Sequence, residues 1–142
     1  MLLMKIDDKT FEDFVDEVWE EIPKHFKEEI ENVTIVIESD PKAYYQKKIA
    51  EGGLLLGLFE GIPKTQWGNT YFGTQPSKIT IFKNPILRVS KNVRELRITV
   101  HVVLMHEIAH YFGYNEEHLF VMDKKLRDKL LEKFSSEESS EG

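Results

Sequence analysis

The chain has 142 residues, which is enough to form one domain with a substantial hydrophobic core. It contains no cysteine, so disulfides and thiolate-bound zinc are excluded, and only His, Asp or Glu can bind a metal ion. The formal net charge of −6, without a basic stripe, argues against nucleic acid as a partner. The first residues lack the apolar core of a signal peptide, and no apolar run is long enough to span a bilayer. We therefore expect a cytoplasmic protein with no membrane partner.

The N-terminal segment has the apolar spacing of a helix and then that of a strand. Apolar residues recur at helical intervals from Phe11 to Ile22 and predict a helix with an acidic, solvated outer face. Pro23 kinks or restarts this helix, and a short second helical segment continues to Ile30. Residues 32–38 carry apolar β-branched residues at alternate positions, which predicts a strand.

The middle of the chain is predicted to contain two further strands. Residues 42–53 are polar and predict a helix or a loop, whereas residues 54–59 are an apolar run between glycines and predict a buried strand. Residues 64–77 predict an irregular segment or a short hairpin. Residues 77–82 predict another strand, and Pro85 opens a single helical turn.

A long helix begins after Asn92, whose side chain is a favourable N-cap, and Glu95 stands at the position that completes a capping box. This helix is apolar nearly all round, which is typical of a buried helix. His101 precedes His106 by five residues and so points away from it. We interpret His101 as a core or surface histidine.

Near the end of this helix lies the sequence His106-Glu107-Ile108-Ala109-His110. Histidines at i and i+4 lie on one helix face, where both imidazoles can reach a single Zn²⁺ at about 2.0–2.1 Å. Glu107 projects about 100° away from His106, so its carboxylate lies beside the metal and can take a proton from a water there. The pattern predicts one Zn²⁺ per chain with Glu107 as general base. Its alternative is a solvated helix face that carries the same residues without function.

The residues after this motif predict a turn and a third metal ligand. Gly113 stands where a helix can end in a left-handed conformation, and the chain can then return toward the metal. Three neighbours compete for the third ligand position. Glu116 has the favoured offset from Gly113, His118 has the better ligand chemistry but lies a turn into the next helix, and Glu117 faces elsewhere. We predict the metal ligands His106, His110 and Glu116.

Asn115 is predicted to cap a last helix whose apolar face includes Leu119, Met122, Leu126 and Leu130. Residues 135–142 contain only Ser, Glu and Gly and predict a disordered tail. Residues 1–134 are therefore predicted to form a single domain.

Several segments resemble the minimal zincins, a family of small bacterial zinc-dependent metallopeptidases. They are residues 32–33 (Asn-Val) at the start of the first predicted strand, residues 55–63 (Leu-Leu-Gly-Leu-Phe-Glu-Gly-Ile-Pro), residues 79–82 (Ile-Thr-Ile-Phe) followed by residues 85–87 (Pro-Ile-Leu), and residues 106–113 (His-Glu-Ile-Ala-His-Tyr-Phe-Gly). The resemblance implies a compact zincin-like α+β fold, in which a small mixed sheet of about three to four strands packs on the metal-bearing helix between N- and C-terminal helices. It also implies a third ligand at position 116, where this chain has Glu and the family favours Asp.

The expected function is hydrolysis of peptide bonds by metal-activated water, with the substrate added as a strand along residues 78–82 or 54–60. Tyr111, Tyr114 and His118 are candidates for stabilising the oxyanion, although packing or capping roles are more common for such residues. Two alternatives use the same residues: a zinc-stabilised interaction module that cleaves nothing, and a hydrolase of a non-peptide amide or ester. Glu107 favours an enzyme, because a purely structural zinc site has no need of that carboxylate. The oligomeric state does not follow from these patterns.

Overall fold

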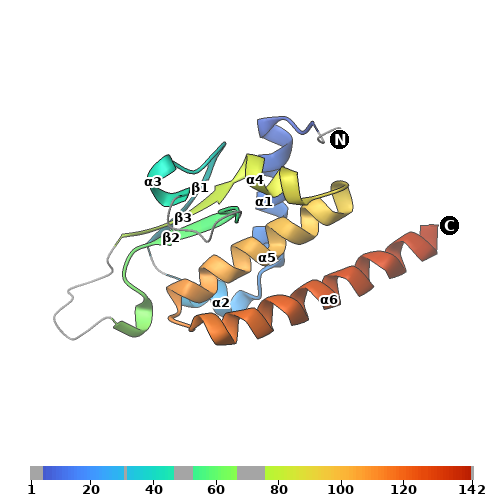
Figure 1. The fold of residues 1–142 in the computed structure, drawn as a ribbon. Coiled ribbons are helices and arrows are strands. Elements are labelled where there is room, and N and C mark those ends of the chain that lie inside the picture. Colours follow the sequence, from blue (N-terminus) through green and yellow to red (C-terminus); the bar gives the residue numbers. More distant parts are fainter. Residues whose placement is uncertain (1–4, 31, 47–52, 67–75, 142) are drawn as a thin grey trace.

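The structure is a computed structural model that describes residues 5–30, 32–46, 53–66 and 76–141. Its architecture is α+β, as the sequence predicts: helices surround a small mixed sheet, and α5 crosses the middle of the molecule between that sheet and α6 (Figure 1). The elements are α1 (Asp8–Glu21), α2 (Lys24–Glu29), β1 (Val33–Glu38), α3 (Ala43–Gln46), β2 (Gly57–Glu60), the 3-10 helix η1 (Lys64–Gln66), β3 (Ser77–Phe82), α4 (Lys83–Val89), α5 (Val93–Tyr111) and α6 (Glu116–Glu141). Much of the predicted irregular segment 64–77 lies outside the described residues.

The sheet has the strand order β1-β3-β2, with β1 parallel to β3 and β2 antiparallel to it. The predicted strand at residues 54–59 is displaced, because ladder pairing with β3 begins only at Gly57. The preceding residue still takes part, since the carbonyl of Leu56 accepts a hydrogen bond from the N–H of Phe82 at 3.0 Å. As β3 is paired on both sides, it is the interior strand, and β2 lies at one edge of the sheet.

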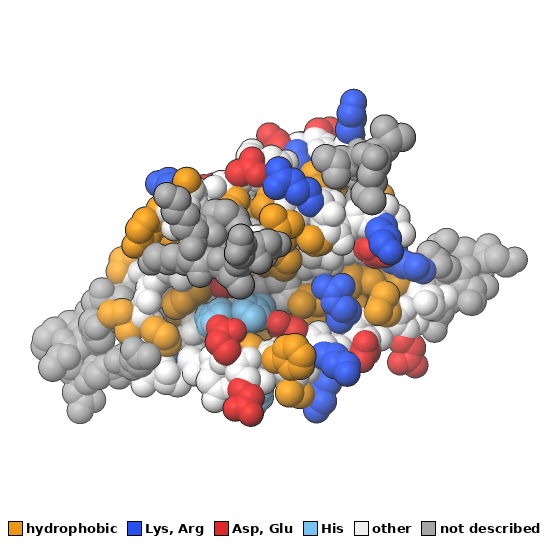
Figure 2. Space-filling model, viewed as in Figure 1, with side chains coloured by type: hydrophobic (Ala, Val, Ile, Leu, Met, Phe, Trp, Pro, Cys, Tyr) orange, Lys and Arg blue, Asp and Glu red, His pale blue; other side chains and the backbone are white. Residues whose placement is uncertain are grey.

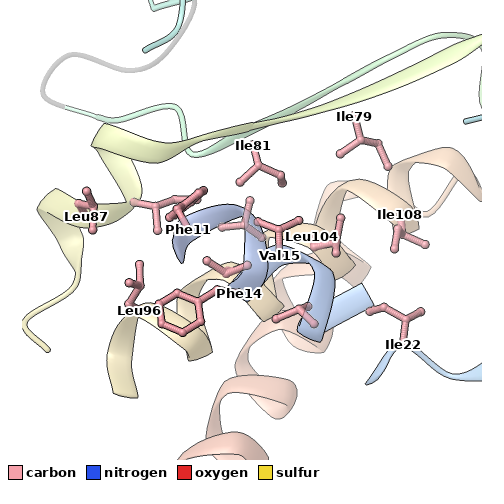
Figure 3. Packing of buried hydrophobic residues seen from close by; sticks show 14 residues of the cluster. Phe11, Phe14, Val15, Ile22, Ile79, Ile81, Leu87, Leu96, Leu104 and Ile108 are labelled. Carbon is pink, nitrogen blue, oxygen red and sulfur yellow. The ribbon is translucent and has the colours of Figure 1, made fainter. Parts of the chain in front are cut away.

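The main core lies between α1, α5 and the sheet (Figure 3). Asp7 caps α1 by accepting the N–H of Thr10 at 2.7 Å, so the helix begins where its apolar face does. That face points at the sheet and at α5. The buried residues of this face are Phe11, Phe14, Val15 and Val18. They pack in one cluster with Ile79 and Ile81 of β3 and with the apolar face of α5.

Helix α5 is buried on two sides, which explains its apolar residues nearly all round. Its N-cap is formed as predicted, because Asn92 accepts the N–H of Glu95 at 2.9 Å. One face joins the main core, and the other forms a second cluster in which Ile98 and Val102 pack against Leu130 of α6. The ring of His101 is also buried, with Nδ1 3.4 Å from a carboxylate oxygen of Glu21.

Helix α6 begins as the sequence predicts, with the Asn115 side chain accepting the N–H of His118 at 2.8 Å. Helix α6 continues through Glu141 and extends beyond α5 (Figure 1). Among the helices of the described residues, none is both long and apolar enough to cross a membrane.

Candidate metal centre

The C-terminal part of α5 brings two imidazoles together. His106 and His110 lie one turn apart, and their Nε2 atoms are 3.1 Å from each other. Two nitrogens bound to one Zn²⁺ at about 2.0–2.1 Å with a tetrahedral angle lie roughly 3.3 Å apart, so this spacing fits a shared ion. Burial is the main cause that lowers the pKa of His110, with the neighbouring His106 acting in the same direction. The lower pKa favours the neutral imidazole, which is the form that binds metals.

Glu107 lies beside this pair, between α5 and the edge strand β2. Its side chain is buried, and ligand atoms of His106, Glu107 and His110 all lie within 4.8 Å of one another. Burial raises the pKa of Glu107 from 4.5 to about 7, although the electrostatic interaction with His106 lowers this pKa. The backbone N–H of Phe59 donates a hydrogen bond to the carboxylate and thereby holds it in place.

The close approach of β2 to Glu107 depends on Gly57. A Cβ at this position would lie 2.7 Å from Cγ1 of Val103 and 3.3 Å from Oε2 of Glu107. The first distance is shorter than real Cβ atoms show, so a side chain here would push β2 away from α5. The glycine within the apolar run 54–59 is thus required by the close packing of β2 on α5, which the sequence alone does not show.

The turn after α5 has the predicted left-handed glycine. Gly113 has a φ of +85°. Its N–H donates to the carbonyl of His110 at 2.9 Å, and the N–H of Tyr114 donates to the carbonyl of Ala109 at 3.1 Å. These two bonds form a Schellman motif, which satisfies the last carbonyls of the helix and reverses the chain.

The reversal brings Glu116 back to the histidines. Its Oε1 lies 3.1 Å from Nε2 of His110, although 76% of its side chain is exposed. The competing His118 is exposed, and its ring stacks on Tyr114 with a centroid distance of 5.0 Å. Tyr111 is buried, with its ring edge-on to Phe59 at 6.3 Å, so packing accounts for its side chain.

Sequence reasoning missed Asp123, which lies on α6. Its Oδ2 is 2.7 Å from Nδ1 of His106. When Nδ1 carries the proton and donates it to this carboxylate, the lone pair of His106 is on Nε2, the atom that faces His110. A signal was available, because Asp123 follows Glu116 by seven residues and therefore occupies the same face of α6.

A cavity of about 550 Å³ opens beside His106 and Glu107. It is bounded by the segment that leads into β2, by α5 and by α6, and its other lining residues are Leu55, Leu56, Gly57, Val102, Val103, Phe120, Asp123, Lys124 and Arg127. Figure 2 shows histidine side chains in a hollow of this face, with acidic side chains on its rim and basic side chains further along. The arrangement provides metal ligands, a buried carboxylate and room for a substrate at one place.

Comparison with known proteins agrees with this chemistry. Residues 30–125 match the zincin-like metallopeptidase family, and the match spans β1 through the first part of α6, including His106, Glu107, His110, Glu116 and Asp123. No curated protein matches the chain. Among solved structures, a conserved hypothetical protein from Thermo thermophilus is 24% identical, with 74% of this chain and 92% of that chain covered and a TM-score of 0.49. The chain belongs to the zincin-like metallopeptidase family, which is a family of metal-dependent peptidases.

Proposed function

We propose that this protein is a zinc-dependent peptidase in which His106, His110 and Glu116 hold one Zn²⁺ and Glu107 is the general base. The observation that carries the proposal is the convergence of the two Nε2 atoms, 3.1 Å apart, with a carboxylate oxygen of Glu116 3.1 Å from one of them. Two imidazoles and one carboxylate are a known ligand set for catalytic zinc, and this set leaves a position open. Glu107 is also near, but its carboxylate is buried and already accepts the N–H of Phe59.

Each of these residues has a separate task in the proposed reaction. A zinc ion held here supplies Lewis acidity, which lowers the pKa of water and polarises a carbonyl oxygen. Glu107 accepts the proton that the attacking water loses and then delivers it to the nitrogen of the leaving amine. In the metal-free protein burial raises the pKa of Glu107 to about 7, and the positive charge of a bound zinc ion would lower it and so favour the carboxylate that accepts the proton. Asp123 keeps the proton of His106 on Nδ1, which reserves Nε2 for the metal.

The edge of β2 is the proposed place for an extended peptide. Of the two candidate edges in the sequence, residues 78–82 are interior, because β3 is paired with both β1 and β2. β2 pairs only with β3 among the described strands, and its residue Gly57 lies directly against Glu107. A peptide that adds to the edge of β2 opposite β3 therefore runs past the catalytic groups, and the β2 main-chain groups other than the Phe59 N–H, which Glu107 accepts, can hold its backbone.

Replacement of Glu107 by Gln tests the proposal, because it keeps the shape of the side chain and removes the base. Wild type and Glu107→Gln are incubated with Zn²⁺ and a peptide library, and the products are identified by mass spectrometry. We expect about one zinc per chain in both proteins and at least a roughly hundredfold lower rate in the variant. Glu117→Gln is the matched control, since this exposed neighbour should leave the rate unchanged.

The same experiment, with amide and ester reporters added to the peptide library, separates the competing functions. Zinc bound through His106 and His110 without cleavage of any peptide by wild type would favour the interaction module. Cleavage of amide or ester reporters alone would favour the non-peptide hydrolase. Equal peptide cleavage by wild type and Glu107→Gln would contradict the proposed mechanism.

A further inference from the structure

The cavity beside His106 and Glu107 has two basic side chains on one wall. Lys124 and Arg127 lie three residues apart on α6, so they project from the same side of that helix into the cavity lining. Both are exposed, and neither forms an ion pair with another described side chain. The acidic residues that line the same cavity, Glu107 and Asp123, belong to the metal centre, so Lys124 and Arg127 place positive charge on the α6 wall beside it.

Arg127 does not pair with Asp123, the acidic residue one turn before it on α6, because the Asp123 carboxylate contacts His106 of the metal centre. Asp123 precedes Arg127 by four residues, the spacing at which an acid and a base pair on a helix surface. Its carboxylate instead contacts Nδ1 of His106 at 2.7 Å. The positive charge of Arg127 therefore remains available to a ligand, although an acid stands at the pairing position.

Apart from the basic pair and the metal-centre residues His106, Glu107 and Asp123, the cavity is lined by apolar residues and Gly57, which strengthens an interaction with the basic charges. Leu55 and Leu56 form one side, Val102 and Val103 of α5 form the floor, and Phe120 of α6 is 74% exposed at the rim. A charge pair that is partly shielded from water by such surfaces is screened less than one in open solvent. An exposed phenylalanine beside the catalytic groups is also suited to contact the aliphatic part of a bound side chain.

We infer that this cavity binds a carboxylate of the substrate, next to the scissile bond and on its C-terminal side. The inference rests on the proposed peptidase function. A peptide that adds antiparallel to β2, the pairing that β2 already has with β3, runs from Glu60 toward Leu55. Its residues after the scissile bond then reach the part of the cavity where Lys124 and Arg127 lie. The carboxylate comes either from a Glu or Asp side chain or from the free C-terminus of a short peptide.

Cleavage of matched peptides tests this inference. Starting from the peptide that wild type cleaves best, four versions are made, with Glu or Gln after the scissile bond and with a free or amidated C-terminus. We expect kcat/KM to be about three- to tenfold higher for a version with the recognised carboxylate, mainly through KM, and the preference to shrink at high salt. The comparison of Glu with Gln tests recognition of a side-chain carboxylate, and the comparison of a free with an amidated C-terminus tests recognition of the terminal carboxylate.

Variants assign the preference to the two basic residues. Lys124→Gln and Arg127→Gln should each reduce the preference while the neutral peptide is cleaved as before, and the double variant Lys124→Glu/Arg127→Glu should prefer Gln over Glu. Lys129→Gln is the control, because Lys129 lines a different cavity between α5 and α6. Equal cleavage of all four peptides by wild type, or an equal loss on acidic and neutral peptides in the variants, would overturn the inference.

A binding measurement keeps the two proposals distinguishable. Zinc-loaded Glu107→Gln is titrated with extended hexapeptide pools that carry an uncharged dye and differ only in Glu against Gln or in a free against an amidated C-terminus, and binding is followed by anisotropy. Tighter binding of the Glu pool or of the pool with a free C-terminus that is lost in Lys124→Gln/Arg127→Gln supports the carboxylate subsite even where wild type cleaves nothing. Indifference to the carboxylate refutes the subsite, whereas absence of turnover refutes only the peptidase.

Discussion

Replacement of Gly113 by Ala should weaken the fold and the metal centre together, because this glycine forms the turn between His110 and Glu116. Its φ of +85° is a left-handed conformation that costs a residue with a Cβ about 1–2 kcal/mol. A Cβ at Gly113 would also overlap the hydroxyl of Thr65 and stand 3.1 Å from the Cβ of Thr65. Such overpacking typically costs about 1–3 kcal/mol.

Two considerations bound the net effect. Ala restricts the unfolded chain more than Gly does, which offsets the loss of stability by about 0.4–1 kcal/mol. We therefore expect Gly113→Ala to lower the free energy of unfolding by about 1–4.6 kcal/mol, which leaves a domain in the middle of the usual stability range folded. Thr65→Ala removes the overlapping hydroxyl and methyl group but not the backbone strain. The double variant should consequently recover about 1–2 kcal/mol of the loss.

Urea denaturation of the four proteins of this double-mutant cycle measures the stability, and competition with a chelator measures the zinc affinity. The zinc affinity of Gly113→Ala should fall as well, because the turn no longer holds Glu116 near His110. Gly113→Asn is a useful comparison, since Asn tolerates the left-handed region better than Ala. A loss below about 0.5 kcal/mol in Gly113→Ala, or strict additivity with Thr65→Ala, would refute this account of the turn.

Further predictions concern the ligands, their support and the pH dependence of folding. Zinc affinity should fall at least about tenfold in Glu116→Ala and much less in His118→Ala, and the reverse order in a chelator competition would identify His118 as the ligand. Asp123→Ala should also lower zinc affinity at least about tenfold, because the Nδ1 proton of His106 loses its acceptor, whereas Asp123→Asn should lose less. Burial lowers the pKa of His101 from 6.5, so the unfolded chain takes up this proton more readily than the folded one. The stability associated with neutral His101 is then fully present above about pH 6.5 and declines as pH falls below it. His101→Gln should make the urea midpoint depend less on pH between about pH 7.5 and 5.5 than it does in wild type.

The parts of the site that are local in the chain were predictable from the sequence. The i, i+4 spacing of His106 and His110 defines a shared helix face whatever surrounds the helix. The Asn92 and Asn115 caps act on backbone groups three residues away, and the left-handed conformation of Gly113 depends on the absence of its own Cβ. These features need no knowledge of the rest of the fold.

Other parts depend on contacts between segments that the chain separates widely. The contact of Asp123 with His106 joins two helices, and the burial that raises the pKa of Glu107 comes from the packing of β2 on α5. The sequence likewise predicted strands at 54–59, from an apolar run, and at 77–82, but not which of them lies at the sheet edge, because neither pattern specifies the strands that pair on each side. The sequence by itself determined which chemical groups the helix end presents. Only the tertiary structure decided which of them are buried, which are oriented and which face an open cavity, because burial and orientation depend on what packs against a residue.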